Sequence, residues 1–217
     1  AKAADIAIVT GDTKVVQRGA ADKLFINTAG IGAIPTGLNW RAQALQPGDV
    51  VLVSGTLGCH GATILNLREQ LGLDGELVSD CAVLTPLIQS LRAINGIRAL
   101  RDATRGGVNA VVHEFAASSG CGIELNEASL PVKPAVRGVC ELLGLDALNF
   151  ANEGKLVIVA ERQAAEAAVE RLRQHPLGGD AAIIGEVVAR KGVRLSGLYG
   201  VKRTLDLPHS EPLPRIC

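Results

Sequence analysis

The last residue of the chain, Cys217, is the side chain with the most accessible chemistry in this sequence. A thiol at a chain end moves further than a nucleophile held inside a domain, and thiolates are intrinsically strong nucleophiles. Prolines at 208, 212 and 214 restrict residues 206–217 in the way that a delivery arm would need. The other interpretation is an incidental cysteine on a frayed end. We expect Cys217 to carry a reacting group.

A second candidate stands at 102–108, where the sequence reads Asp-Ala-Thr-Arg-Gly-Gly-Val before a predicted helix. Its carboxylate, hydroxyl and arginine would meet at the helix amino end, where backbone N–H groups favour a metal–phosphate ligand. The alternative is a capped helix, in which Asp102 or Thr104 bonds the first-turn amides. Both interpretations are compatible with the sequence.

Two polar turns carry acid–base candidates. At 11–14 the sequence reads Gly-Asp-Thr-Lys, in which Asp12 can hold magnesium and Lys14 can neutralise phosphate or transfer a proton. At 152–155 it reads Asn-Glu-Gly-Lys, and Glu153 can act as a base at the mouth of the strand that follows. On the local pattern alone, an ordinary polar turn is the more frequent reading of each.

A glycine-rich turn at 54–61 reads Ser-Gly-Thr-Leu-Gly-Cys-His-Gly. Such a turn can offer backbone amides to an anion, but it lacks the Gly-Lys-Ser/Thr of a Walker A motif. A structural turn is equally compatible, and His60 reads as a packing or capping residue. The internal cysteines lie in apolar or glycine-rich stretches and are predicted to be inert buried thiols; they are Cys59, Cys81, Cys121 and Cys140.

The elements that must position these residues alternate irregularly between strands and helices, which favours an α+β domain. We place a boundary loop at 35–48, a main domain at 48–204 and a flexible tail at 205–217. The predicted strands are 6–9, 23–34, 50–53, 122–125, 155–160 and 182–188. The predicted helices are 62–71, one starting at Thr85-Pro86, 108–119, 133–143 and 163–174.

Composition excludes several classes of protein. Lys plus Arg and Asp plus Glu are both 22 among 217 residues, so the formal charge of zero argues against a nucleic-acid partner. No apolar run approaches the roughly 18–20 residues of a membrane helix, and no leader is recognisable, so we expect a cytoplasmic protein. The chain has no Met and starts like the last turn of a helix. We therefore expect it to be a fragment that lacks its natural amino terminus.

Together these motifs resemble the aminoimidazole ribonucleotide synthetase-like, or PurM-like, superfamily of ATP-using enzymes. The Gly-Asp-Thr turn, Asp-x-Thr-Arg-Gly-Gly and Glu-Gly before a strand occur in that order in its members. The terminal Pro-Arg-Ile-Cys, with Gly-Asp-Thr-Lys and Asn-Glu-Gly-Lys, is similar to the HypE family of hydrogenase maturation factors. The resemblance implies an α+β C-terminal domain, preceded by a remnant of an ATP-binding domain at 1–36 and followed by an extended tail.

The resemblance also implies a reaction. Cys217 would receive a carbamoyl group from the carbamoyltransferase HypF, and ATP would drive its dehydration to a thiocyanate. The cyanide would pass to iron on a HypC–HypD scaffold, for the active site of [NiFe]-hydrogenase. The full-length protein would form a homodimer, whereas this fragment alone would not turn over ATP.

The roles implied by the resemblance fall on the motifs above. Glu153 is the implied base, with Lys14 as its partner or relay. The implied magnesium ligands are Asp12 and Asp102. The residues implied to lie close to the nucleotide are Asp12, Thr13, Thr104, Gly106 and Gly107.

Three other functions compete with this one. The chain could belong to another ATP-using member of the superfamily, such as selenophosphate synthetase, although those enzymes usually place their reactive residue near the amino terminus. It could be a non-catalytic carrier of a carbamoyl group, against which the presence of Glu153 and Lys14 argues. It could also be an interaction module whose terminal thiol is incidental.

Overall fold

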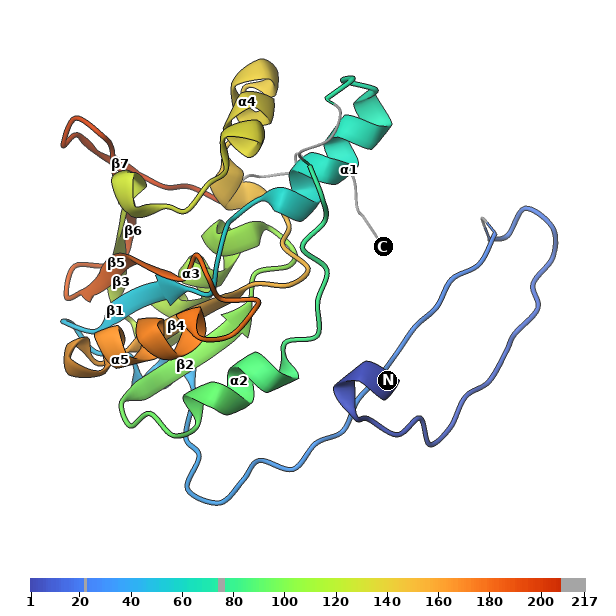
Figure 1. Ribbon diagram of the computed structural model, residues 1–217, viewed down its shortest axis with the longest axis horizontal. Coiled ribbons are helices and arrows are strands. Elements are labelled where there is room, and N and C mark those ends of the chain that lie inside the picture. Colours follow the sequence, from blue (N-terminus) through green and yellow to red (C-terminus); the bar gives the residue numbers. More distant parts are fainter. Residues whose placement is uncertain (22, 74–76, 208–217) are drawn as a thin grey trace. The chain divides into compact units, whose positions relative to one another are not determined.

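A computed structural model describes residues 1–21, 23–73 and 77–207 of the chain (Figure 1). The chain divides into two compact units, residues 1–39 and residues 40–217. Cys217 lies outside the described residues, as does the predicted tail from residue 208 onward.

In the first unit the only regular element among the described residues is a 3₁₀ turn at Lys2–Ala4. The strands predicted at 6–9 and 23–34 are therefore wrong for this structure. Apolar, β-branched residues favour a strand, but a strand forms only when a neighbour supplies the other half of its hydrogen-bond ladder. Ile8, Val9 and Phe25 are instead 81%, 89% and 71% exposed.

The second unit is built on one sheet, in which the described strands follow the order β2-β4-β1-β5-β3-β6-β7. Neighbouring strands are antiparallel except for β3 and β6, which are parallel. The strands are β1 (Val50–Val53), β2 (Ile97–Asp102), β3 (Gly122–Asn126), β4 (Leu156–Ala160), β5 (Ala182–Val188), β6 (Gly192–Ser196) and β7 (Lys202–Thr204).

Helices cover both faces of this sheet, which explains why its central strands are apolar at every position (Figure 1). In β1, Val51 and Val53 face a core shared with α3, whereas Leu52 faces a core shared with α2 and α5. A third cluster joins α1 and α4 around Phe150. The helices are α1 (Cys59–Glu69), α2 (Thr85–Leu91), α3 (Gly107–Ser119), α4 (Pro134–Leu143) and α5 (Arg162–Arg173), with short 3₁₀ turns at Ala42–Ala44, Glu127–Ser129 and Ala147–Asn149.

The predicted α+β class is confirmed, and most elements of the second unit lie where the sequence placed them. The predicted strands at 50–53, 122–125, 155–160 and 182–188 agree with the structure to within one residue at each end. Three strands were missed, namely β2, β6 and β7. Helix α1 begins at Cys59, three residues before the predicted start, whereas α2 begins at Thr85 as predicted.

The main domain extends past the boundary predicted at 204. Leu205 is only 3% exposed and belongs to the core cluster under α3. Its N–H donates to the Val193 carbonyl at 3.0 Å, and its carbonyl lies 2.8 Å from His113 Nε2. The Asp206 carbonyl accepts a hydrogen bond from Asn109 Nδ2. Leu205 and the Asp206 main chain are thus part of the domain.

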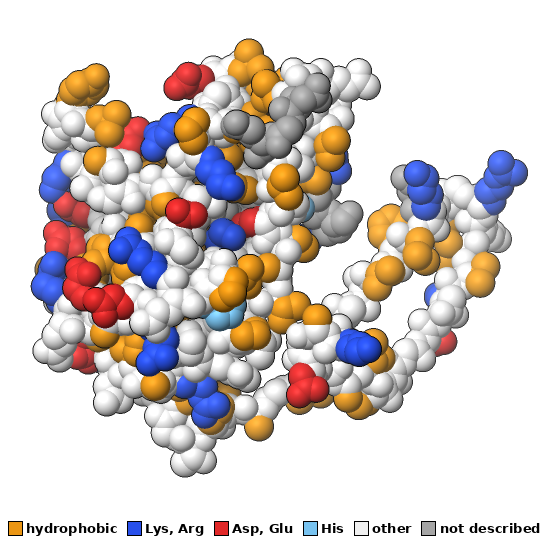
Figure 2. Space-filling model, viewed as in Figure 1, with side chains coloured by type: hydrophobic (Ala, Val, Ile, Leu, Met, Phe, Trp, Pro, Cys, Tyr) orange, Lys and Arg blue, Asp and Glu red, His pale blue; other side chains and the backbone are white. Residues whose placement is uncertain are grey.

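On the surface, basic and acidic side chains are interspersed over the visible face of the second unit (Figure 2). This distribution fits the formal net charge of zero. Among the described residues, none of the helices combines the length and the apolar character needed to cross a membrane.

The two-sided burial of β4 gives the first testable prediction. Ile158 is fully buried, and its replacement by alanine removes side-chain volume that the two helices α2 and α5 cannot refill. We expect Ile158→Ala to lower the free energy of unfolding by about 2–5 kcal/mol. Leu67→Ala, at a site 68% exposed, should change it by less than about 0.5 kcal/mol. Urea unfolding followed by circular dichroism measures both, and equal effects would contradict the assigned core.

Candidate active site

A buried amide, the side chain of Asn152, joins three turns of the second unit. The residue is 1% exposed. Its Oδ1 accepts from the Gly58 N–H at 2.8 Å, and its Nδ2 donates to the carbonyls of Ala103 at 3.1 Å and Phe150 at 2.9 Å. The Asn152 N–H also donates to the Ala103 carbonyl at 3.0 Å. The turns that follow β1 and β2 therefore meet the turn that precedes β4.

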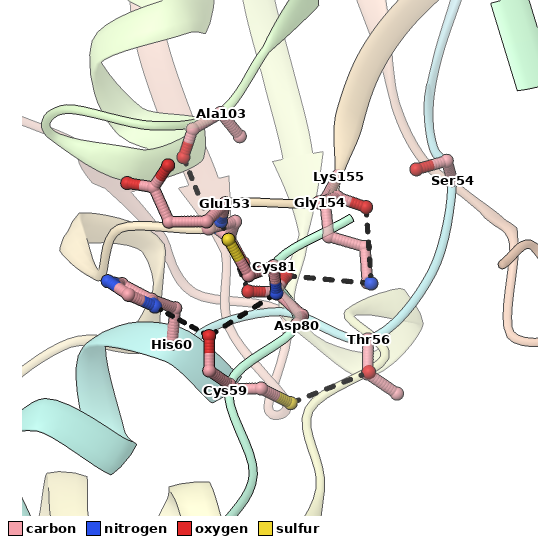
Figure 3. Close-up of polar contacts among 12 residues, drawn as sticks. Ser54, Thr56, Cys59, His60, Asp80, Cys81, Ala103, Glu153, Gly154 and Lys155 are labelled. Carbon is pink, nitrogen blue, oxygen red and sulfur yellow. Dashed lines mark hydrogen bonds and ion pairs between the residues drawn. The ribbon is translucent and has the colours of Figure 1, made fainter. Parts of the chain in front are cut away.

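The next residue, Glu153, is held by its backbone against the segment 79–82 (Figure 3). Its N–H donates to Asp80 Oδ1 at 3.1 Å, and its carbonyl accepts from the Ala82 N–H at 3.3 Å. A Cβ at Gly154 would overlap the Asp80 carbonyl oxygen, so this close approach requires glycine. The Glu153 residue as a whole is half-buried, which leaves part of its side chain accessible to a substrate.

Close to Glu153 lies an ion pair between Asp80 and Lys155, in which Oδ2 and Nζ are 3.5 Å apart (Figure 3). The two side chains are only 6% and 9% exposed. Lys155 Nζ also donates to the Gly154 carbonyl at 3.3 Å. The pair borders an open pocket of about 320 Å³, whose lining includes Gly55, Thr56, Ser79 and Cys81.

The motif at 102–107 lies at the junction of β2 and α3. Thr104 Oγ1 donates to Asp102 Oδ2, and no side chain among the described residues caps α3, whose N-cap is Gly106. The capped-helix interpretation is therefore wrong. Gly107 has φ 62°, and a Cβ there would overlap the carbonyl oxygens of Leu148 and Phe150. This glycine lets the first turn of α3 pack directly on the chain that leads to Asn152.

The glycine-rich turn at 54–61 serves the packing of this site. The Gly58 N–H is committed to Asn152, so it is not directed at an anion. His60 is 8% exposed, and its Nδ1 lies 2.8 Å from Ser79 Oγ. Its Nε2 has no hydrogen-bond partner among the described residues. The packing role expected for His60 agrees with this environment.

The structure brings together several of the predicted site residues, whereas others belong to the first unit. The Ala103 carbonyl, between Asp102 and Thr104 in the sequence, accepts hydrogen bonds from Asn152, which directly precedes Glu153. The motif that contains Asp102, Thr104, Gly106 and Gly107 therefore lies in the same region as Glu153. Residues Asp12, Thr13 and Lys14 are exposed and belong to the first unit, where the Thr13 N–H bonds Asp12 Oδ1 at 2.8 Å. The catalytic and binding roles of all these residues remain predictions.

A magnesium site is compatible with the residues of this part of the chain. Mg²⁺ is usually held by one or two carboxylates together with substrate phosphates and water. Asp102 is exposed at the end of β2 and can supply one such oxygen. Within the described ranges, no group of three or more His, Cys, Asp or Glu side chains is placed to hold a metal ion.

Comparison with known proteins identifies the family. The family described as AIR synthase related protein, C-terminal domain, matches residues 46–197. The carbamoyl dehydratase HypE of Escherichia coli K12 is 82% identical over 217 residues, covering all of this chain and 65% of that protein. A solved structure of a hydrogenase maturation protein HypE, 42% identical, covers 97% of this chain and 68% of its own with a TM-score of 0.91. The chain belongs to the HypE family.

Further HypE structures confirm the PurM-like fold. The crystal structure of E. coli HypE superposes with a TM-score of 0.95 at 82% identity, covering 97% of this chain and 66% of that one. A HypE–HypF complex matches at 45% identity over 78% of this chain and 56% of that one, with a TM-score of 0.76. The structure of a HypE in complex with ATP matches at 37% identity over 80% of this chain and 54% of that one, with a TM-score of 0.76. The chain spans 65% of the length of its curated E. coli relative.

Two side chains of this HypE-family site were missed by sequence reasoning. Asp80 bonds to a residue 73 positions away in the chain, and no local pattern links the two. Cys81 was predicted to be buried but is exposed, because its segment borders the open pocket. Lys155 and Asn152 were recognised only as neighbours of Glu153. An isolated aspartate in a loop carries no signal that would have revealed its role.

The cysteines differ in expected reactivity. Cys140 is half-buried, and burial, with a smaller contribution from Asp146, raises the pKa of its thiol to about 11. A raised pKa means less thiolate at pH 8, so Cys140 should resist alkylation until the pH approaches 11. Cys81 is exposed and should be alkylated first among the described cysteines.

Brief iodoacetamide treatment at pH 8, followed by peptide mass mapping, tests this order. Cys217 is scored separately, and Cys81→Ser should remove the fast internal adduct. Modification of Cys140 as rapid as that of Cys81 would contradict the assigned environments.

Proposed function

We propose that the protein, in its full-length form, is an ATP-dependent carbamoyl dehydratase that converts a carbamoyl group on the Cys217 thiol into a thiocyanate. The observation that carries this proposal is the 82% identity, over the whole chain, to a protein described as carbamoyl dehydratase HypE. It is supported by the position of Glu153, which is half-buried, lies beside the 102–107 turn and has both backbone groups hydrogen-bonded.

In the proposed reaction the carbamoyl oxygen accepts a phosphoryl group, which converts a poor leaving group into phosphate. ADP leaves as that C–O–P linkage forms, and one N–H proton is released to solvent. The second is taken by Glu153 as the C–O bond breaks, so that the carbon–nitrogen bond becomes triple and phosphate departs. The balance is thiocarboxamide plus ATP giving thiocyanate, ADP and phosphate, which removes the elements of water.

The remaining residues have proposed roles in this scheme. Lys14 would act as partner or relay for Glu153, and Asp12 and Asp102 would hold magnesium, which neutralises phosphate charge. The residues proposed to contact the nucleotide are Asp12, Thr13, Thr104, Gly106 and Gly107. We also propose that residues 1–36 are part of an ATP-binding domain, so that this chain alone is inactive. A solved HypE with ATP supports the use of that nucleotide.

The proposed partners are those of the HypE family. A solved HypE–HypF complex supports HypF as the carbamoyl donor. A HypC–HypD iron scaffold would accept the cyanide for [NiFe]-hydrogenase, and the full-length protein would form a homodimer. A carrier or interaction module would need no fixed base, whereas both backbone groups of Glu153 are hydrogen-bonded here. Another superfamily activity is disfavoured by the identity to HypE.

Replacement of the base tests the dehydration step. Glu153→Gln keeps the shape and hydrogen bonding of the side chain but removes its basicity. In the full-length protein with HypF and ATP, carbamoylation of Cys217 should persist while dehydration slows about 10²–10⁴-fold. The mass of the terminal peptide reports both steps, since dehydration removes one water. The matched control is Glu170→Gln on the exposed face of α5. Dehydration at the parental rate in Glu153→Gln would refute the assignment.

Removal of the terminal thiol tests the acceptor. Cys217→Ala should abolish carbamoylation and leave ATP affinity within about twofold of the parent, because the thiol is the acceptor and not part of the nucleotide pocket. Incorporation of labelled carbamoyl and equilibrium ATP binding measure the two properties. Cys121→Ala serves as control. Carbamoyl incorporation that survives Cys217→Ala would show that another residue is the acceptor.

A further inference from the structure

We propose that Asp80 is a positioning residue for Glu153, which fixes the direction of the catalytic carboxylate through the backbone. Lys155 makes this possible because it neutralises the charge of Asp80, whose side chain is largely buried from water. The inference rests on the proposed role of Glu153 as the base. It assigns a task to a buried ion pair that the reaction scheme itself does not use.

The contacts restrain both peptide groups of Glu153. Its N–H is bound by Asp80 Oδ1 at 3.1 Å and its carbonyl by the Ala82 N–H at 3.3 Å. The Gly154 α-carbon packs so closely on the Asp80 carbonyl that no side chain fits between them. On the other side, the side chain of Asn152 is held by three hydrogen bonds. The backbone φ and ψ angles of Glu153 are therefore restrained by the contacts of its own peptide groups and of the residues before and after it.

The two oxygens of Asp80 have different tasks. Oδ1 accepts the Glu153 N–H, whereas Oδ2 makes no hydrogen bond among the described residues and is balanced by the ion pair to Lys155 at 3.5 Å. A buried carboxylate without such a partner would be strongly unfavourable, and so would the lysine alone. The positioning interaction is the hydrogen bond from Glu153, and the lysine is the condition that lets an aspartate provide it.

This division decides how the pair can be tested. A single substitution at either position leaves an unpaired buried charge, which would destabilise the fold for reasons unrelated to positioning. Two double variants avoid that problem. Asp80→Asn/Lys155→Met keeps an acceptor oxygen for the Glu153 N–H, and Asp80→Ala/Lys155→Met removes it. Both pairs are neutral, so they differ mainly in the hydrogen bond under test.

Both double variants are prepared in the full-length protein and assayed with HypF and ATP. We expect equal carbamoylation of Cys217 and the same KM for ATP. The kcat of dehydration should fall about 10- to 100-fold in the alanine pair, as for a displaced catalytic group, and stay within about threefold of the parent in the asparagine pair. Hydrogen exchange at the Glu153 amide should accelerate only in the alanine pair. Equal dehydration rates in the two pairs would overturn the proposal.

Two further measurements keep the outcome decisive. Exchange at the Glu153 amide of the unmodified protein needs no variant, and a rate close to that of an unstructured peptide would refute the restraint even if both double variants fail to fold. Parental dehydration in Glu153→Gln, combined with a protected Glu153 amide, would instead refute the proposed function and leave the structural restraint standing. The two failures are thus distinguishable.

Discussion

The buried amide of Asn152 is the interaction on which the arrangement of the site depends. It accepts a hydrogen bond from one N–H and donates to two carbonyls. Only a side-chain amide both donates and accepts in this way over so short a distance. Aspartate would lack the donor, and alanine would remove the side-chain partner of the Gly58 N–H and of the Phe150 carbonyl. The sheet order explains why one residue can reach all three turns. β4 lies between β2 and β1 and is antiparallel to both, so its beginning lies beside the ends of its two neighbours.

That topology also explains which part of the site the sequence could reveal. The motifs at 54–61, 102–108 and 152–155 were recognised individually, and each adjoins a strand. Their meeting depends on β2, which was missed because its sequence, Ile-Arg-Ala-Leu-Arg-Asp, places charges inside a strand. Arg98 is tolerated there because Asp49 and Glu161 lie 3.4 and 3.2 Å away. Those partners come from distant segments of the chain, so they cannot be predicted from the local sequence pattern around Arg98.

The first unit shows the opposite failure. The segments 6–9 and 23–34 were predicted to be strands like the run at Val50–Val53, yet only the latter forms one. Val50–Val53 pairs with β4 on one side and β5 on the other, and its side chains enter two cores. Local sequence supplies the propensity of a strand but not its partner. The same reasoning explains β7, which has exposed polar residues and exists because β6 lies beside it.

Asp80 illustrates why the support of a catalytic group is harder to read than the group itself. Glu153 stands in a recognisable turn, whereas its restraint comes from a loop 73 positions away. An unpaired aspartate at this position would be a buried negative charge without compensation, which is strongly unfavourable. Pairing with Lys155 makes the net charge of the support zero, so Asp80 can accept the Glu153 N–H without that penalty. A lysine at position 155 is therefore favoured by the aspartate at position 80. That aspartate is in turn favoured by the Glu153 N–H, which needs an acceptor.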